Sequence, residues 1–494
     1  MNQEKRNSLW LAIQYIVAII FSLITLKLNL LTYGKELFGS WILISSLWGF
    51  GRALDFGLGT SIIRFVAEYN HKDASRLNYL LSTCLLLMFF LGIIIFILIF
   101  EIGQLIYFST NEILGSEHIE EIRIVFLILG LSFYLNYIII IIKSVFEGMS
   151  DFGTTSRISI LYSTLVLISV VIVFLFNLPL LILSYFITIS SFVSLAIYIF
   201  TFKLKYSNIH ISWKYFEPAL LKKVFCFSIA IQGAAMFGSL IDPLIKYLIG
   251  NFSSIGSVSV YEIARRFVTA ITGLFNTTFR PILPKASILS NKDDFSSFLY
   301  NECANLSRIG ITYSGTVFGM GALIIPVIIK QIFNYDDAVL IFFILALPES
   351  INNFGYAIYN FLIGIEKAYF LVMVQLINVI VIGLSVFLGL IIFGNLLGLL
   401  GYGLTVIIVN ILMILFAQKI TGISIKKYFL LSKAYNLLIL LLFLLTTVFL
   451  ISNNYLNLYI LMFILGCLSA VVFINDLKRY SHLIFKKIKF NGNV

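Results

Sequence analysis

Charged side chains interrupt segments that are otherwise apolar enough to cross a bilayer. Residues 38–69 read FGSWILISSLWGFGRALDFGLGTSIIRFVAEY, with Arg52 and Asp55 inside a long apolar run. A charged side chain at the centre of a membrane helix costs about 2.5–3.5 kcal/mol on insertion scales. A chain tolerates this cost where the charge faces the interior of a helix bundle or a wet cavity. The segment therefore predicts a membrane helix that carries a cation into the inner half of the bilayer.

More charges of this kind lie in the second half of the chain. Asp242 and Lys246 stand four residues apart, which places both on one helix face. Glu262 precedes Arg265 by three residues and Arg266 by four, so it can pair fully with only one of them. At 1.5 Å of rise per residue, the two arginines lie about 12–16 Å below the outer surface. Adjacent arginines at that depth favour function over packing.

Glu349 is an isolated acid near the middle of an apolar segment, with no basic residue within one helical turn. Four interpretations stay open for it. It can hold a coupling proton, it can bind a cation together with Asn352 and Asn353, it can pair with an arginine of another helix, or it can make a structural hydrogen bond.

Taken together, the intramembrane bases predict a site for an anion of high charge if they converge in one cavity. Arginine in particular suits bidentate recognition of phosphate. The predicted cationic site consists of Arg52, Lys246, Arg265 and Arg266. The predicted supporting or ion-coupling acids are Asp55, Asp242, Glu262 and Glu349. Two plainer interpretations also stay open, in which Arg52 and Asp55 form a packing pair and Lys246 is an interfacial lysine.

The composition is that of an all-α polytopic membrane protein. Of the 494 residues, 60% are hydrophobic and only 12% are charged, whereas soluble domains are about one quarter charged. The net charge of +11 is explained by basic cytoplasmic loops, and no nucleic-acid partner is expected. The four cysteines and four histidines show no ligand spacing, so neither a metal nor another cofactor is predicted. No phosphate loop is present, and no catalytic residue is predicted.

The polar breaks divide the chain into fourteen segments, each long enough to span a bilayer. They cover residues 9–32, 38–64, 78–100, 122–146, 156–177, 179–202, 221–249, 256–281, 299–329, 338–363, 369–393, 397–419, 434–452 and 456–476. Lysine and arginine gather on one side of these spans, which places both termini in the cytoplasm. The predicted parts are an N-terminal lobe (1–202), a C-terminal lobe (203–433), and two final helices with a basic tail (434–494).

Four stretches of the chain together resemble a known family. They are TYGKELFGSWILISSL with the following LDFGLGTSIIRFVAEY, KSVFEGMSDFGTTSRISIL, and LIDPLIKYLIGNFSSIGSVSVYEIARRFVTAITGLF. In this order they resemble bacterial polysaccharide repeat-unit flippases, of the O-antigen or capsule type. These flippases belong to the multidrug/oligosaccharidyl-lipid/polysaccharide exporter superfamily. The resemblance runs along the whole chain, including the count of twelve helices plus two.

The resemblance implies two six-helix lobes around a central cavity and a transporter in the bacterial inner membrane. The implied substrate is an undecaprenyl-diphosphate-linked oligosaccharide, flipped to the outer leaflet by alternating access. Because no phosphate loop is present, the energy must come from an H⁺ or Na⁺ gradient, the membrane potential or product removal. A polysaccharide polymerase and chain-length proteins are the expected partners. The resemblance also implies that cationic side chains on the first, second, seventh and eighth helices line the cavity, which marks Arg52, Lys246, Arg265 and Arg266 in this sequence. The first helix departs from this pattern, because its only internal base, Lys27, stands near the outer end.

Two alternatives from the same superfamily stay open. A cation-coupled multidrug antiporter would use the buried acids, although three of these have a basic neighbour on their own helix. A peptidoglycan-precursor lipid flippase shares the architecture and the charge pattern. A glycan polymerase or ligase is disfavoured, because the longest predicted outer loop, residues 101–121, is short and acidic.

Overall fold

The computed structural model of the chain is helical throughout the part that it describes. Within that part the α-helices are joined by turns and by short 3₁₀ and π segments, and no β-strand occurs there. The chain forms two compact units, residues 1–259 and 260–494, which we call the first and the second unit. The structure describes residues 3–54, 57–72, 76–109, 119–279, 304–364, 368–394, 396–421, 467 and 469–476.

The first helix of the first unit contains one break, and a second break follows its end. α1 (Gln3–Ala53) leaves helical geometry at Gly34, with φ 68° and ψ 178°. This break falls between the first two predicted spans. α2 (Leu58–Lys72) begins directly after Gly57, whose φ is 73°. The predicted span 38–64 therefore comprises the last part of α1 and the first part of α2. Glycine enters the left-handed region without a Cβ clash, and a residue in that region ends a right-handed helix.

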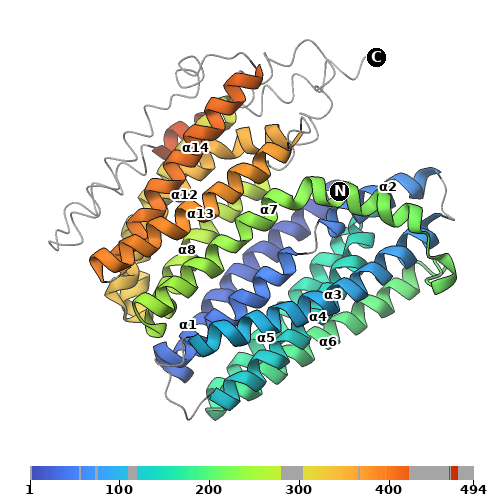
Figure 1. Cartoon of the computed structure of the whole chain (residues 1–494), viewed down its shortest axis with the longest axis horizontal. Helices are drawn as coiled ribbons and strands as arrows, with labels where there is room; N and C mark the ends of the chain where they lie inside the picture. Colours follow the sequence, from blue (N-terminus) through green and yellow to red (C-terminus); the bar gives the residue numbers. More distant parts are fainter. Residues whose placement is uncertain are drawn as a thin grey trace. The chain divides into compact units, whose positions relative to one another are not determined.

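Five further helices complete the first unit. They are α3 (Arg76–Ser109), α4 (Ile119–Gly148), α5 (Phe152–Phe176), α6 (Leu180–Lys205) and α7 (Pro218–Phe252). α5 packs on α1, and α4 packs on both α3 and α6 (Figure 1). Packing in lipid relies on close approach and polar contacts rather than on water exclusion. Accordingly, the Trp48 indole donates to the Phe126 carbonyl, and the hydroxyls of Ser132 and Ser191 lie 2.8 Å apart.

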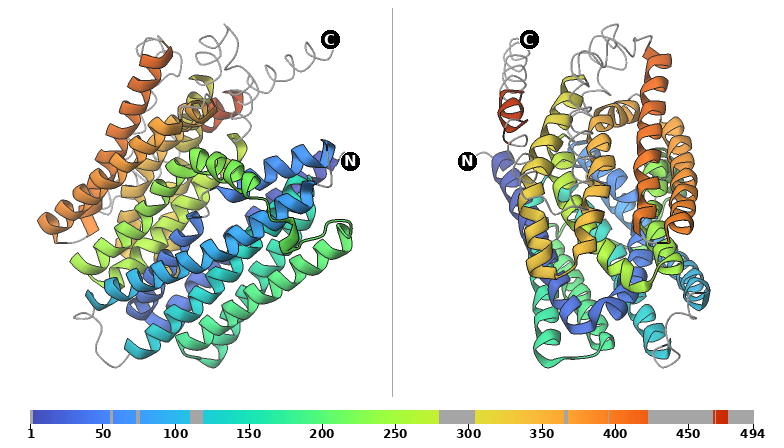
Figure 2. Two further views of the ribbon diagram at one scale, coloured as in Figure 1. Left: turned by 45° about the vertical axis from the view of Figure 1, so that its right-hand side comes forward. Right: turned by 90° about the vertical axis from the view of Figure 1, so that its left-hand side faces the viewer.

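The second unit is built mainly from five helices. They are α8 (Ile255–Phe279, whose first turn belongs to the first unit), α11 (Ala304–Ile328), α12 (Asp336–Gly364), α13 (Ala368–Phe393) and α14 (Leu400–Thr421). α12 packs against α11 and α14, and α14 also packs against α13 (Figure 2). The predicted spans 434–452 and 456–476 lie outside the described residues, apart from 467 and the helical turn 469–476.

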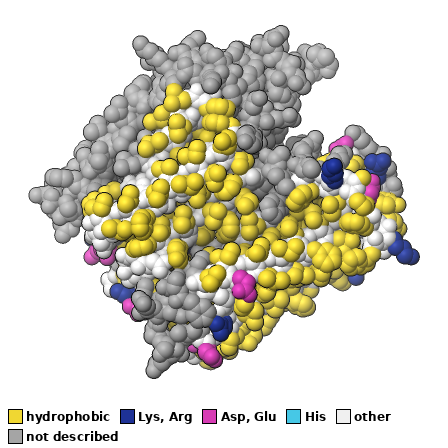
Figure 3. Space-filling view, in the orientation of Figure 1, with side chains coloured by type: hydrophobic (Ala, Val, Ile, Leu, Met, Phe, Trp, Pro, Cys, Tyr) yellow, Lys and Arg dark blue, Asp and Glu magenta, His cyan; other side chains and the backbone are white. Residues whose placement is uncertain are grey.

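The outer faces of these helices suit a lipid environment. Within the described residues, seven helices are long and apolar enough to cross a membrane, or eight if one bent pair in 304–333 is a single span. The apolar stretch counted within α1 contains the Gly34 break. Hydrophobic side chains cover most of the described surface seen in Figure 3, and only a few charged side chains are visible on it. The chain is a multi-pass membrane protein, while the count of fourteen spans and the predicted domain boundaries stay predictions.

Candidate functional site

The charges of α8 form one ion pair along their own helix. The Arg266 Nε lies 2.8 Å from the Glu262 Oε1, one helical turn away. The sequence allowed Glu262 to pair with either of two arginines, and the structure shows the pair with Arg266. The spacing of four residues places the two side chains on one face, which the spacing to Arg265 does less well.

The neighbouring arginine instead reaches a different helix. Arg265 on α8 contacts Glu349 on α12, with 2.6 Å between Nη1 and Oε1. The same carboxylate oxygen accepts from the Tyr402 hydroxyl of α14 at 3.1 Å, and the other accepts from the Asn352 amide at 3.2 Å. An ionised carboxylate accepts at both oxygens, so the three donors match it. Among the interpretations left open for Glu349, the structure thus shows a pair with an arginine of another helix.

A polar network continues from this carboxylate into the helix packing. Asn410 of α14 donates to the Asn352 side chain at 3.2 Å, and Asn353 donates to Ser314 of α11 at 2.9 Å. Gly355 makes room for this network, because a Cβ there would overlap the Asn410 side chain. Tyr402 and Asn410 are not among the site residues predicted from the sequence. For Asn410 a signal was present, because it is the one polar residue within the apolar run VIIVNILMIL.

The Arg265–Glu349 and Arg266–Glu262 pairs expose the base more than the acid. The side chains of Arg265 and Arg266 are 23% and 31% exposed, while their carboxylate partners are each 11% exposed. A ligand that reaches this cluster therefore meets guanidinium groups before it meets carboxylates. Such groups bind phosphate through several directed N–H donors.

The predicted base of α7 shows the opposite arrangement. Lys246 pairs with Asp242 one turn earlier, with 2.6 Å between Nζ and Oδ2. Here the lysine side chain is 7% exposed and the aspartate 31% exposed. The pair is a contact within α7, in the first unit, and the carboxylate is its more accessible member.

The last two predicted site residues are described only in part or not at all. Arg52 lies in the final turn of α1, and its side chain is not among those described. Asp55 lies outside the described residues, between α1 and α2. Within the described part of the chain, no group of three or more His, Cys, Asp or Glu side chains could hold a metal ion.

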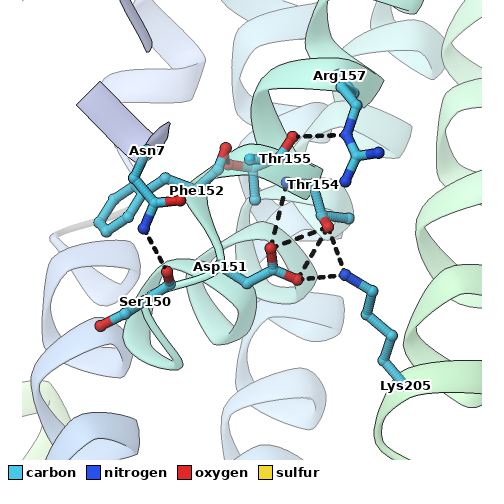
Figure 4. Close-up of polar contacts among 9 residues, drawn as sticks. Asn7, Ser150, Asp151, Phe152, Thr154, Thr155, Arg157 and Lys205 are labelled. Carbon is cyan, nitrogen blue, oxygen red and sulfur yellow. Dashed lines mark hydrogen bonds and ion pairs between the residues drawn. The ribbon is translucent and has the colours of Figure 1, made fainter. Parts of the chain in front are cut away.

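The turn between α4 and α5, part of the stretch KSVFEGMSDFGTTSRISIL, forms a second polar cluster in the first unit. Asp151 caps α5 by accepting from the Thr154 backbone N–H at 3.3 Å, and the Lys205 ammonium of α6 lies 2.6 Å from the same carboxylate (Figure 4). Burial raises the pKa of Asp151, but hydrogen bonds from Lys205 and Thr154 outweigh it, so the pKa is lowered from its usual 3.8.

The same turn also fastens the N-terminal end of α1. The Asn7 side-chain amide donates to the Ser150 carbonyl at 2.8 Å (Figure 4). The guanidinium of Arg157 lies 5.7 Å from the centre of the Trp10 ring, within the range of a cation–π contact. The turn between α4 and α5, which we call the α4–α5 corner, thus contacts both α1 and α6, and these contacts stabilise this end of the first unit.

Comparison with solved structures shows the fold of flippases and multidrug transporters. The chain is similar to an inward closed structure of the lipid II flippase MurJ, with TM-score 0.64 and 17% identity over 97% of this chain and 99% of that chain. It is also similar to an inward-facing multidrug resistance MATE transporter, with TM-score 0.65 and 15% identity over 85% and 98% of the two chains. These similarities, together with the apolar helices, show the multi-pass helical membrane fold that the chain shares with these proteins.

The sequence comparisons name the family. A family model described as "Polysaccharide biosynthesis protein" matches residues 4–287, more than half of the chain. The chain therefore belongs to this polysaccharide biosynthesis family. A protein of Shigella flexneri described as "Putative O-antigen transporter" is 24% identical over 339 residues, which cover 63% of this chain and 75% of that protein.

Proposed function

We propose that the protein flips undecaprenyl-diphosphate-linked oligosaccharide repeat units from the cytoplasmic to the outer leaflet for surface polysaccharide synthesis. Family membership, the similarity to an O-antigen transporter and the flippase-like fold support this function. The observation that carries it is that the side chains of Arg265 and Arg266 are more exposed than those of their carboxylate partners. A diphosphate needs such directed cationic donors, whereas the substrate of a cation exporter would need the carboxylates in front.

The ion pairs suggest how binding and release alternate. Within the described residues, Lys246, Arg265 and Arg266 each contact a carboxylate. An arriving diphosphate therefore competes with Glu349 for Arg265 and with Glu262 for Arg266. When each carboxylate forms its ion pair with the arginine again, the diphosphate loses its donors and the substrate is released. In this exchange each arginine has an anionic partner, a carboxylate or a phosphate, both before and after binding.

Glu349 is the proposed coupling group. Once the diphosphate displaces it from Arg265, its carboxylate can take a proton, and it loses the proton again when the ion pair reforms. Asn352 stands beside it and supplies amide groups, so Na⁺ is the other candidate ion. The proposed location is the bacterial inner membrane with both termini in the cytoplasm. A polymerase and chain-length proteins remain predicted partners.

The test uses cells that lack the gene and are complemented with variants. Cells without the protein should accumulate lipid-linked repeat units on the cytoplasmic side and lose surface glycan. Arg265→Gln and Arg266→Gln should each lower surface glycan by about tenfold or more, the loss expected of one charged hydrogen bond. Lys330→Gln serves as the control, because Lys330 pairs with Asp336 at an exposed position.

Membrane levels of each variant are measured by immunoblot alongside the glycan. Normal surface glycan in both arginine variants, at normal protein levels, would rule out the cationic site. Altered drug sensitivity in cells without the protein, with no accumulated repeat units, would instead support a multidrug antiporter.

A further inference from the structure

The first unit contains an apolar cavity that includes none of the predicted site residues. Its volume is about 560 Å³, and it lies among α3, α4, α6 and residues 206–211. A smaller cavity of about 220 Å³ adjoins it and shares Leu85, Ile138 and Ile211 as lining residues. The larger volume is within the range of about 300–1,000 Å³ that is typical of sites for one small molecule.

Most of the wall of this cavity is hydrocarbon. The three helices contribute aliphatic and aromatic side chains, including Leu81, Leu85, Ile138, Ile142, Ile199 and Phe202. Apolar cavities of this kind are poor sites for water, which needs two to four polar partners. The chemistry of the wall therefore selects an apolar chain.

The remaining wall is formed by residues 206–211, the first part of the segment that connects α6 to α7, and this segment is fixed in place. Its backbone N–H groups at His210 and Ser212 donate to the side chains of Asn78 and Ser82 on α3, at 2.9 and 3.1 Å. Figure 2 shows this segment in green, in the left-hand view, beside the end of α3. Because side chains of α3 hold the segment, the cavity is formed without any ligand.

The depth of the cavity matches one leaflet of a bilayer. Leu85 stands nine residues after the start of α3, and Ile138 stands ten residues before the end of α4. At 1.5 Å per residue these positions lie about 13–15 Å from the helix ends. Half of a hydrocarbon core of about 30 Å is about 15 Å. The cavity thus reaches about 13–15 Å in from the helix ends, a length comparable to the thickness of one leaflet.

The mouth of the cavity carries basic and interfacial groups. Lys203 and His210 line it, and Lys203 has no ion-pair partner in the described part of the chain. Lys205, two residues later, is held by Asp151 instead (Figure 4). The nearby Trp213 side chain is 69% exposed, as expected of an aromatic group at a membrane interface.

We propose that this cavity binds one acyl chain of an anionic phospholipid, with the headgroup phosphate at Lys203 and His210. A methylene group is close in size to a water molecule, which occupies about 30 Å³ in the liquid. At that volume per group, the cavity of about 560 Å³ holds on the order of 20 carbons. That volume fits one acyl chain and is far too small for an undecaprenyl tail. The occupant is therefore a membrane phospholipid and not the tail of the proposed substrate.

The test is native mass spectrometry of the delipidated full-length protein with dioleoyl phosphatidylglycerol or dioleoyl phosphatidylcholine. The wild-type protein should retain one phosphatidylglycerol, and it should bind it about fivefold more tightly than phosphatidylcholine, the effect of one lysine at an anionic surface. Lys203→Gln should remove this preference, while Lys222→Gln should keep it, because Lys222 is exposed and does not line the cavity.

Filling the cavity provides the second arm of the test. Ile199→Trp should abolish retention of the lipid. Ile189→Trp is the matched control, because Ile189 lies on the same helix, is 55% exposed and is not a lining residue. Leu85→Phe replaces Ile199→Trp if the latter does not fold. Retention by a folded filled variant, or no preference for phosphatidylglycerol in the wild-type protein, would overturn the proposal.

Discussion

Arg265 of α8 and Glu349 of α12 form an ion pair of 2.6 Å across 84 positions of the sequence. The pair joins two helices of the second unit, and it leaves the base more exposed than the acid. One contact thus combines a structural role with a binding role. Separating these two roles requires variants that remove the charges one at a time and then together.

A neutralisation cycle at this pair distinguishes packing from substrate binding. Arg265→Gln should reduce surface glycan by roughly ten- to a hundredfold, the effect of one lost charged hydrogen bond. Glu349→Gln keeps the cation and should bind lipid-linked substrate at least as tightly, while turnover falls. The double variant should regain wild-type protein levels but not transport, measured as glycan per unit of protein. Transport restored in the double variant would show that the pair only supports packing.

A second buried ion pair ties the turn 469–476 to α11. Arg308 contacts Asp476, and their side chains are 15% and 5% exposed. Removing one partner of a buried pair costs about 3–5 kcal/mol, because the other charge stays uncompensated. Asp476→Leu and Arg308→Met should each lower the midpoint of thermal unfolding in detergent. The double variant should recover most of it, and an additive loss would contradict this account.

Gly39 marks a close approach between α1 and the first turn of α8 within the first unit. A Cβ at Gly39 would overlap the Ile255 carbonyl oxygen, and the Ser259 hydroxyl donates nearby to the Lys35 carbonyl at 2.5 Å. Gly39→Ala should therefore destabilise the protein by about 1–3 kcal/mol, as overpacking does. Gly250→Ala is the control, since its Cβ would lie 3.7 Å from the nearest side-chain atom. Thermal unfolding of both variants measures the difference.

Asp151 predicts a pH dependence at the α4–α5 corner. Its folded pKa is lowered from 3.8 by the hydrogen bonds of Lys205 and Thr154, although burial opposes them. A lowered pKa adds stability that is fully present above the unfolded value and is lost as the pH falls through the folded value. Asp151→Asn should thus unfold at a lower temperature than the wild type at pH 7. The gap should shrink toward pH 3, and a constant gap would contradict the prediction.

Part of the candidate site could be predicted from spacing alone. Charges four residues apart on a helix share a face, so the sequence already paired Asp242 with Lys246 and gave Glu262 an arginine of its own helix. The hydrophobic content likewise required helices, because a spanning segment must satisfy its backbone hydrogen bonds internally. Both inferences depend only on local geometry.

Contacts between distant segments could not be predicted in this way. Whether Glu349 meets an arginine, an asparagine or a proton depends on which helices pack together, and that is decided by side-chain volumes and close approaches along the whole bundle. The same holds for Tyr402 and Asn410, which reach the site from α14. The position of the break in the second predicted span, at Gly57, could not be derived from the sequence either, because glycine permits a left-handed turn without requiring one.

The sequence by itself determined that this protein is a helical multi-pass membrane protein and which charges it places in apolar segments, since composition and periodicity are local properties. The tertiary structure decided which partner each charge has and which member of each pair is exposed. Of the predicted cationic residues, Lys246, Arg265 and Arg266 form ion pairs in the structure. Arg265 and Arg266 are more exposed than their carboxylate partners, whereas Lys246 is less exposed than Asp242. The physical reason is that burial without a partner is too costly, and partners are chosen by packing between helices.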